Sequence, residues 1–220
     1  MTLELERDGA QLFPRALDGS ALDDLERLVP SSTGPGERIY QNRRLADWLI
    51  RGPAGSISRG VLGGSAKPVR AILFDKTPEA NWSLGWHQDR TIGVRERKDT
   101  PGFNHWNSKA GAIHVEPPFE LLERMLTARI HLDTVPEENA PLLIAPGSHR
   151  KGRIAEDGIQ GVVEQCGSFA CLATAGDIWL YQTTILHASD RSVAADRRRV
   201  LQVDYSAESL PGGLEWLGVG

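Results

Sequence analysis

The residues between Gly85 and Arg90 include the side chains of a metal site. His87 and Asp89 are separated by one residue, and a further histidine, His187, lies far downstream. Residues i and i+2 of an extended strand point to the same side, so His87 and Asp89 can reach one ion together. Two imidazoles and one carboxylate on one face of a metal are the ligand set of a mononuclear non-haem iron(II) site. The sequence therefore predicts a metal centre of this type.

The same histidine-x-carboxylate spacing occurs three times, so spacing alone does not choose the pair. The three pairs are His87/Asp89, His114/Glu116 and His131/Asp133. His114 lies in a polar stretch where the backbone is least fixed, which makes its pair the weakest candidate. His131 lies on a predicted strand and shares its face with Arg129, as a cavity lining would. For His131 we favour a buried, hydrogen-bonded histidine over a metal ligand.

The first 52 residues predict a helical flank. Ser20 is a suitable N-cap, leucines follow it at helical spacing, and Pro30 should end this helix. A second helix is expected from Asn42 to Gly52. Residues 52–64 are rich in glycine, serine and proline and predict a loop. Both helices are expected to pack against the core, because neither carries a catalytic pattern.

Short strands dominate the rest of the chain. They are expected at residues 69–74, 128–135, 142–145, 168–173, 178–185 and 200–205, with one short helix at 119–126. Many short strands preceded by helices are typical of a double-sheet barrel. We therefore expect one mainly β domain, with a double-stranded β-helix (a jelly-roll or cupin-like barrel) over residues 69–205 and flanking N-terminal and inserted helices. The polar residues 93–118 predict an irregular, lid-like insertion.

Length and composition limit the other possibilities. The 220 residues, 40% of them hydrophobic, suffice for a single buried domain. The net charge of −4 comes from 29 acidic and 25 basic residues spread through the chain, which argues against a nucleic-acid partner. Neither a secretion signal nor a run of about 18 apolar residues occurs, so we expect no membrane contact and a cytoplasmic location. Cys166 and Cys171 are expected to be reduced thiols.

Several motifs together carry a family resemblance. They are Trp86-His87-Gln88-Asp89, the stretch from Leu143 to His149 (LIAPGSH), Gly176-Asp177, His187-Ala188-Ser189, and Arg198 eleven residues beyond His187. In this order and spacing they resemble the phytanoyl-CoA dioxygenase family of iron(II)- and 2-oxoglutarate-dependent oxygenases. The matching features run from about residue 69 to residue 205. The resemblance implies that the metal ligands are His87, Asp89 and His187.

The resemblance also implies a cosubstrate site. Three protein ligands leave three positions of an octahedral iron(II) open, which suffice for bidentate 2-oxoglutarate and for O2. The distal carboxylate of 2-oxoglutarate then needs a permanent cation, and a guanidinium supplies two parallel hydrogen bonds. Arg198 is the candidate, with Ser189 as a hydroxyl donor. A solvated basic patch is the alternative for residues 197–199, although only alternate members of a strand share one face.

The implied reaction is hydroxylation of an unactivated C–H bond of a small molecule, with release of succinate and CO2. A carboxylate at Asp89 argues against halogenation, because a small residue there would be needed to admit chloride. Trp86 and Arg129 are candidate substrate contacts, although Arg129 could instead form a structural ion pair. Two alternatives remain: a small-molecule binding protein with a vestigial metal site, and a cupin-like metal enzyme that does not use 2-oxoglutarate. The sequence does not indicate an oligomeric state.

Overall fold

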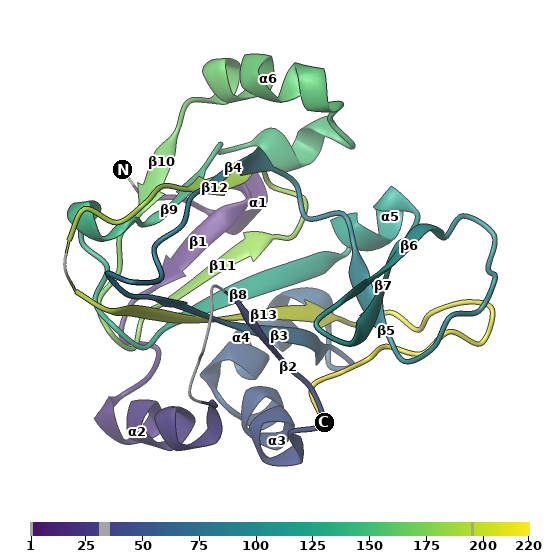
Figure 1. Ribbon diagram of the computed structural model, residues 1–220, viewed down its shortest axis with the longest axis horizontal. Helices are drawn as coiled ribbons and strands as arrows, with labels where there is room; N and C mark the ends of the chain where they lie inside the picture. The colour runs from purple at the N-terminus through teal and green to yellow at the C-terminus, as the bar shows by residue number, and fades with distance from the viewer. Residues whose placement is uncertain (1, 31–35, 195) are drawn as a thin grey trace.

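Two antiparallel sheets form the core of the molecule. The computed structural model describes residues 2–30, 36–194 and 196–220. The larger sheet has the strand order β1-β11-β8-β13-β3-β2 and the smaller one β10-β9-β12-β4, and the two lie one above the other in Figure 1. Strands of the larger sheet are β1 (Ala10–Phe13), β2 (Glu37–Ile39), β3 (Lys67–Lys76), β8 (Met125–His131), β11 (Ile178–Gln182) and β13 (Arg198–Ser206). This arrangement confirms the mainly β, double-sheet fold.

Alternate residues of the larger sheet face opposite sides. On β8, Ala128 and Ile130 pack into the main apolar core with Leu201 and Val203 of the neighbouring β13, and all four are 0% exposed. The residues between them, such as Arg129, point to the smaller sheet. One face of the sheet is therefore a conventional core, and the other is polar and can line a site.

Three helices cover the apolar face of the larger sheet: α2 (Gly19–Leu28), α3 (Arg43–Arg51) and α4 (Pro53–Leu62) (Figure 1). Helix α3 begins after Asn42 as predicted, because the Asn42 side chain accepts a hydrogen bond from the Leu45 amide. The cap predicted for α2 was wrong. Asp18, not Ser20, accepts the bond from Ala21 N, and the Ser20 hydroxyl donates to Asp18. The carboxylate of Asp18, two residues before Ser20, accepts the capping hydrogen bond in place of the Ser20 hydroxyl.

The loop predicted at residues 52–64 is wrong, since α4 fills this segment. Pro53 occupies the first turn of the helix, where its missing amide proton costs nothing. The small residues serve close packing: a Cβ added to Gly55 would lie 2.2 Å from the Leu49 carbonyl oxygen. Composition alone suggested a loop, whereas contact with α3 selects a helix.

The first 52 residues are also not wholly helical. After the short helix α1 (Leu5–Asp8), strand β1 pairs with β11, and β2 pairs with β3 at the opposite edge of the larger sheet. Both strands are too short for a clear alternation in the sequence. The N-terminal segment therefore contributes two edge strands as well as helices.

The insertion at residues 93–118 is ordered rather than irregular. It forms a three-stranded antiparallel sheet of β5 (Ile92–Val94), β7 (Ala112–Glu116) and β6 (Asn104–Lys109), seen at the right of Figure 1. Val94 and Val115 pack in a second apolar cluster with Trp216 from the C-terminal segment. Strand β6 is largely exposed, so it lacks the apolar alternation by which a strand is recognised.

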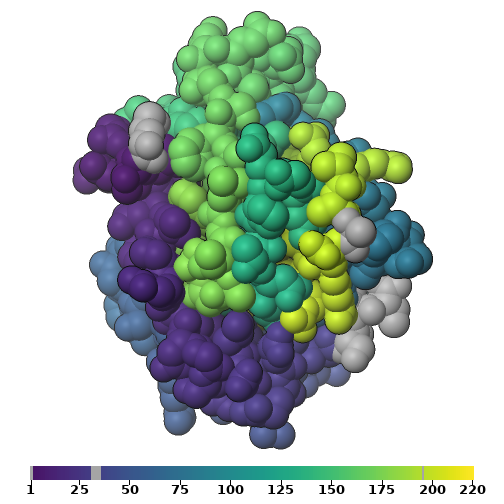
Figure 2. Space-filling view, turned by 90° about the vertical axis from the view of Figure 1, so that its left-hand side faces the viewer, coloured from purple at the N-terminus to yellow at the C-terminus, as the bar shows by residue number. Residues whose placement is uncertain are grey.

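The smaller sheet carries the remaining elements. Its strands are β4 (Leu84–His87), β9 (Leu142–Ile144), β10 (Phe169–Cys171) and β12 (His187–Ser189). Helix α6 (Ile159–Cys166) lies beyond this sheet, at the top of Figures 1 and 2. Helix α5 covers only Phe119–Glu123, and the predicted helical residues Met125 and Leu126 begin β8 instead. Short 3-10 turns occur at Glu137–Asn139, Ser148–Lys151 and Glu156–Gly158. None of the described helices is long and apolar enough to cross a bilayer.

Candidate metal centre and adjoining cavity

Strand pairing brings the two distant histidines together. In the antiparallel pair β4·β12, His87 lies directly opposite His187, and their ring centroids are 4.3 Å apart. Asp89 follows β4 by two residues. Ligand atoms of all three residues lie within 4.8 Å of one another, the only such histidine, cysteine or carboxylate cluster among the described residues. A single ion can contact all three side chains at this spacing.

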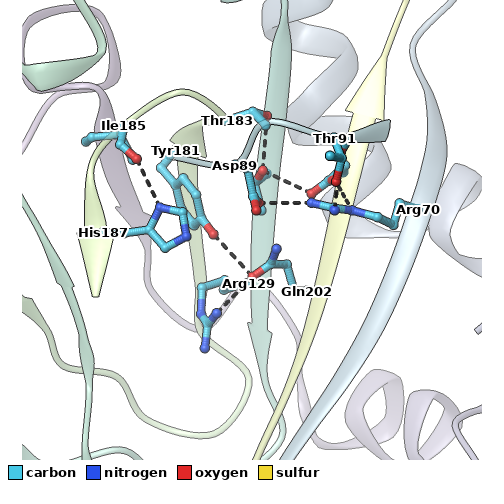
Figure 3. A network of polar contacts seen from close by, with 11 residues as sticks. Arg70, Asp89, Thr91, Arg129, Tyr181, Thr183, Ile185, His187 and Gln202 are labelled. Carbon is cyan, nitrogen blue, oxygen red and sulfur yellow. Dashed lines mark hydrogen bonds and ion pairs between the residues drawn. The ribbon is translucent and has the colours of Figure 1, made fainter. Parts of the chain in front are cut away.

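Each histidine is held by a carbonyl of its own chain. His87 Nδ1 lies 2.8 Å from the Gly85 carbonyl oxygen. His187 Nδ1 lies 2.9 Å from the Ile185 carbonyl oxygen, as Figure 3 shows. Because a carbonyl only accepts, Nδ1 carries the proton and Nε2 keeps its lone pair. Burial, reinforced by His87, lowers the pKa of His187 to about 4, so its ring is neutral at pH 7.

The Asp89 carboxylate is fixed by Arg70. Arg70 Nη2 donates to Asp89 at 2.9 Å (Figure 3), and its Nε donates to Asp204 at 2.5 Å. Burial opposes ionisation of Asp89, but Arg70 and the two histidines outweigh it and lower the pKa of Asp89 to about 2. The pKa of Asp204 is shifted in the opposite direction, because burial raises it. Asp89 is therefore an anion throughout the neutral range.

A cavity of about 970 Å³ opens over this cluster. It lies between the two sheets and is bordered by the insertion and by α6. All seven side chains singled out in the sequence line it, namely Trp86, His87, Asp89, Arg129, His187, Ser189 and Arg198. The structure thus gathers the predicted metal, cosubstrate and substrate residues at one place.

Arg198 lies on the interior wall of this cavity and is 2% exposed. Its Nη1 donates to the Ala140 carbonyl, and its Nε has no partner among the described residues. Lys76 lies directly opposite Arg198 in the β3·β13 pair, and Lys76 Nζ donates to Ser189 Oγ at 3.2 Å. Burial, followed by Arg129, lowers the pKa of Arg198 to about 9, so it remains a cation at neutral pH. Two buried basic side chains facing each other favour an anion between them.

Arg129 does not form the ion pair considered as an alternative. Its Nη1 donates to Gln202 Oε1 at 2.9 Å, its guanidinium lies 5.3 Å from the Phe74 ring, and no carboxylate of the described chain lies within ion-pairing distance. Tyr181 donates to the same Gln202 oxygen (Figure 3). The guanidinium of Arg129 therefore keeps hydrogen-bonding capacity for a ligand.

The two other histidine-carboxylate pairs do not form clusters. Asp133 lies beyond the end of β8 and accepts two bonds from the Arg199 side chain. Arg199 is on the opposite face of the sheet from His131, because its neighbour Val200 is paired with His131. His131 is buried as expected, but neither ring nitrogen has a hydrogen-bond partner among the described residues, so the expected hydrogen bonds are absent. Glu116 pairs with Arg153, while His114 Nδ1 bonds the Ala112 carbonyl. The histidine-x-carboxylate spacing occurs in all three pairs, but only His87 and Asp89 lie next to a third possible ligand, His187.

Sequence reasoning missed three supporting residues. Arg70 lies within an apolar strand and Lys76 at its end. A charged residue in an apolar strand is unusual, and this was the available sign that the two side chains have a role in a site. Gln88 points away from the metal cluster, where its amide bonds Gly152 O, Thr184 O and Ile154 N. These bonds fix the backbone between His87 and Asp89. No local sequence pattern reveals this role.

Comparison with known families decides the class. Residues 64–200 match the family model of phytanoyl-CoA dioxygenase (PhyH). The chain belongs to the phytanoyl-CoA dioxygenase family. It is accordingly a non-haem iron enzyme that depends on 2-oxoglutarate and O2, which excludes the two alternatives raised from the sequence. Curated protein sequences contain no match to the chain.

Solved structures share the fold of this phytanoyl-CoA dioxygenase family member at low identity. EctD from S. alaskensis, with 2-oxoglutarate and 5-hydroxyectoine, has a TM-score of 0.69 at 16% identity over 92% of this chain and 73% of its own. AviO1 from Streptomyces viridochromogenes Tue57 has a TM-score of 0.65 at 18% identity, covering 94% and 93%. The non-heme alpha ketoglutarate dependent epimerase SnoN from nogalamycin biosynthesis has a TM-score of 0.62 at 16% identity, covering 95% and 87%. These likenesses establish the fold.

Proposed function

We propose that this enzyme hydroxylates an unactivated C–H bond of a small molecule, with iron(II) held by His87, Asp89 and His187. The observation that carries the metal assignment is the spacing of their ligand atoms, all within 4.8 Å. The donor set fits iron(II), because two imidazoles and one carboxylate are the protein ligands typical of such a site, and all three line the cavity. When bound, the metal supplies the activation of O2 that is coupled to decarboxylation of 2-oxoglutarate.

The chain's own residues prepare this site. The carbonyls of Gly85 and Ile185 hold both imidazoles with Nε2 free, and Arg70 holds the Asp89 carboxylate as an anion. These contacts reduce the reorganisation that metal binding would require. The low pKa values of Asp89 and His187 also reduce competition from protons.

Arg198 and Ser189 are proposed to bind the distal carboxylate of 2-oxoglutarate. The unpartnered Nε of Arg198 and the Ser189 hydroxyl both lie on the cavity wall below the metal cluster. Lys76 donates to the Ser189 oxygen, and the Ser189 hydroxyl donates at 3.5 Å to the carbonyls of Ala140 and Asp190, long contacts that a bound carboxylate would replace. A buried guanidinium with free donors is suited to a carboxylate.

Trp86 and Arg129 are proposed to contact the substrate. Trp86 packs against the apolar cluster beneath α6 and presents part of its surface to the cavity. Arg129 offers donors that no described carboxylate uses. We also propose that the sheet of β5, β6 and β7 acts as a lid, since Lys109 at its hairpin reaches the cavity.

One spectroscopic assay tests the assignment. Under anaerobic conditions, iron(II) plus 2-oxoglutarate should give the weak visible charge-transfer band of a chelated complex. We expect no band in His87→Ala and a weaker band in Arg198→Ala, at equal iron loading. A folded, iron-loaded protein without the band would refute the proposal. Product analysis should then find one added oxygen atom and one succinate for each substrate consumed.

A further inference from the structure

The hairpin of the insertion is docked at the mouth of the cavity. Ala110 and Gly111 form the two-residue turn between β6 and β7, with positive φ angles of 49° and 79°. The Tyr40 hydroxyl donates to the Ala110 carbonyl at 3.4 Å. Tyr40 immediately follows β2, so this contact holds the hairpin against that edge strand. As a result Lys109, before the turn, lies near Arg38 in β2, and both line the cavity.

The cavity lining is strongly cationic although the chain as a whole is acidic. Its two carboxylates are Asp89 and Glu156, against six cations: Arg38, Arg70, Arg90, Lys109, Arg129 and Arg198. The net charge of the whole protein is −4. A cavity of one sign inside low-dielectric walls concentrates ligands of the opposite sign. The excess of positive charge is therefore a property of the site and not of the surface in general.

Most of these cations have another partner. Arg70 bonds Asp89 and Asp204, Arg90 donates to the Ile154 carbonyl at 2.6 Å, and Arg198 faces the proposed cosubstrate site. Arg129 donates to Gln202. Asp89 is already engaged by Arg70 and by the proposed metal. Glu156, the other carboxylate of the lining, lies 3.8 Å from Arg90, so neither lining carboxylate is left for the cations at the mouth.

Arg38 and Lys109 remain without a carboxylate partner in the described chain. The residues outside the described ranges, 1, 31–35 and 195, include no aspartate or glutamate in the sequence. Burial, then repulsion by Arg70, lowers the pKa of Arg38, and burial, then repulsion by Arg38, lowers that of Lys109, while the more distant Asp89 acts in the opposite direction on both pKa values. Two like charges held close together by a docked hairpin repel each other, and an anion bound between them would relieve this repulsion.

We propose that the substrate carries an oxyanion, a carboxylate or phosphate ester, that Arg38 and Lys109 bind at the mouth of the cavity. The inference rests on the proposed function, in which 2-oxoglutarate is held elsewhere by the metal and Arg198. The arrangement would orient a substrate with its charged end at the hairpin and its apolar part toward Trp86 and the metal. It assigns the insertion a direct role in substrate recognition.

Binding of simple probes tests this directly. The protein is loaded with zinc(II) in place of iron and with saturating 2-oxoglutarate, so that added anions cannot simply occupy the Arg198 site. Phenyl phosphate and benzoate are then compared with phenol and benzamide by titration calorimetry. We expect the charged probes to bind at least about tenfold more tightly, as a charge-assisted contact would give.

Variants locate the binding site. In the double variant Arg38→Gln/Lys109→Gln this preference should disappear, and Lys109→Glu, a change at an exposed hairpin position, should weaken the charged probes without a folding cost. Lys67→Gln removes an exposed lysine of β3 outside the cavity and should bind the probes as the wild type does. Equal binding of charged and neutral probes, or a preference that survives in the double variant, overturns the inference.

The outcome is separable from failure of the proposed function. The charge-transfer band with iron(II) and 2-oxoglutarate depends on the triad and Arg198, not on Arg38 or Lys109. If the band forms but neutral compounds stimulate succinate release as well as their carboxylate or phosphate counterparts, the substrate inference fails alone. If the band does not form, the proposed function fails first.

Discussion

The Arg70 guanidinium links two buried carboxylates that come from different parts of the chain. Asp89 belongs to the segment after β4, whereas Asp204 belongs to β13. Side-chain exposure is 12% for Arg70 and 3% for Asp204, so water cannot replace the lost partner. A single residue thus couples the proposed metal ligand to the sheet on which the site is built.

We expect Arg70→Met to be strongly destabilising. Breaking a buried pair leaves uncompensated charge and costs about 3–5 kcal/mol of the free energy of unfolding. Arg95→Met is the matched control, because Arg95 pairs with Glu215 on the surface and such pairs contribute about 1 kcal/mol or less. Urea unfolding of the metal-free proteins measures both values. Equal losses in the two variants would contradict this role for Arg70.

Lys76 is expected to act with Arg198 on the distal carboxylate of 2-oxoglutarate. Lys76→Met should weaken 2-oxoglutarate binding about tenfold, the effect of one charge-assisted contact. Pyruvate has the same metal-binding end but no distal carboxylate, so its affinity should not change. Titration of the anaerobic iron(II) complex measures both ligands, with Lys67→Met as the control. A parallel loss for pyruvate would show that the change is not specific to the distal carboxylate.

The same lysine predicts a pH dependence. Burial, then Arg198 and Arg129, lowers the pKa of Lys76 to about 7 in the free protein. A bound dianion raises this pKa, so binding takes up a proton above pH 7, and the affinity for 2-oxoglutarate should fall as pH rises from 7. Comparing the affinity at pH 6.5 and 8.5 checks this. A Lys76→Met protein with an unchanged pH profile would assign the effect to another group.

At the scale of elements, α4 shows how small residues allow close packing. The Cβ of an alanine at Gly55 would lie 2.2 Å from the Leu49 carbonyl oxygen, whereas one at Gly60 would meet no atom within 4 Å. Both glycines lie in the same helix. The first glycine is therefore required by the junction between α3 and α4, and the second only weakens the helix.

Gly55→Ala and Gly60→Ala should consequently have opposite effects. We expect Gly55→Ala to lower the free energy of unfolding by about 1–3 kcal/mol through overpacking. Gly60→Ala should raise it by about 0.5–1 kcal/mol, the difference in helix propensity. Thermal and denaturant unfolding of the pair measure both signs. If both substitutions stabilised the protein, α3 and α4 would be able to move apart without lowering the free energy of unfolding.

At the scale of the whole molecule, the space between the two sheets is a low-dielectric region that contains cations. His131 lies there, 2% exposed, and burial followed by Arg129 and Arg198 lowers its pKa to about 3. An unfolded histidine titrates near 6.5. Between these values the unfolded chain binds one more proton than the folded protein, so stability falls as pH decreases from 6.5 to 3.

His131→Leu should remove this contribution. The variant's free energy of unfolding should depend on pH less steeply between 6.5 and 3, by about 1.4 kcal/mol per pH unit. Leucine also replaces a side chain with two unpartnered ring nitrogens by an apolar one, so the variant should not be less stable at neutral pH. Unfolding curves at pH 4, 5, 6 and 7 test the slope. Parallel pH profiles would place the His131 ring in contact with water.

The sequence determined the residue types of the site and the class of the enzyme. His87, Asp89, His187 and Arg198 could be proposed from the sequence because metal and carboxylate chemistry restrict the side chains and their order, and the family resemblance chose among three pairs of identical spacing. Alternating strands also predicted the double-sheet core. The insertion, α4 and the edge strands β1 and β2 escaped prediction, since their apolar patterns are weak and only contacts with distant segments select their conformation.

The tertiary structure decided which residues meet. Antiparallel pairing of β4 with β12 places His187 opposite His87, and pairing of β3 with β13 places Lys76 opposite Arg198. It also separates Asp133 from His131 and brings Lys109 to Arg38 through the Tyr40 contact. The physical reason is that spacing along a chain fixes only local geometry, whereas strand register and burial determine which distant charges share one cavity.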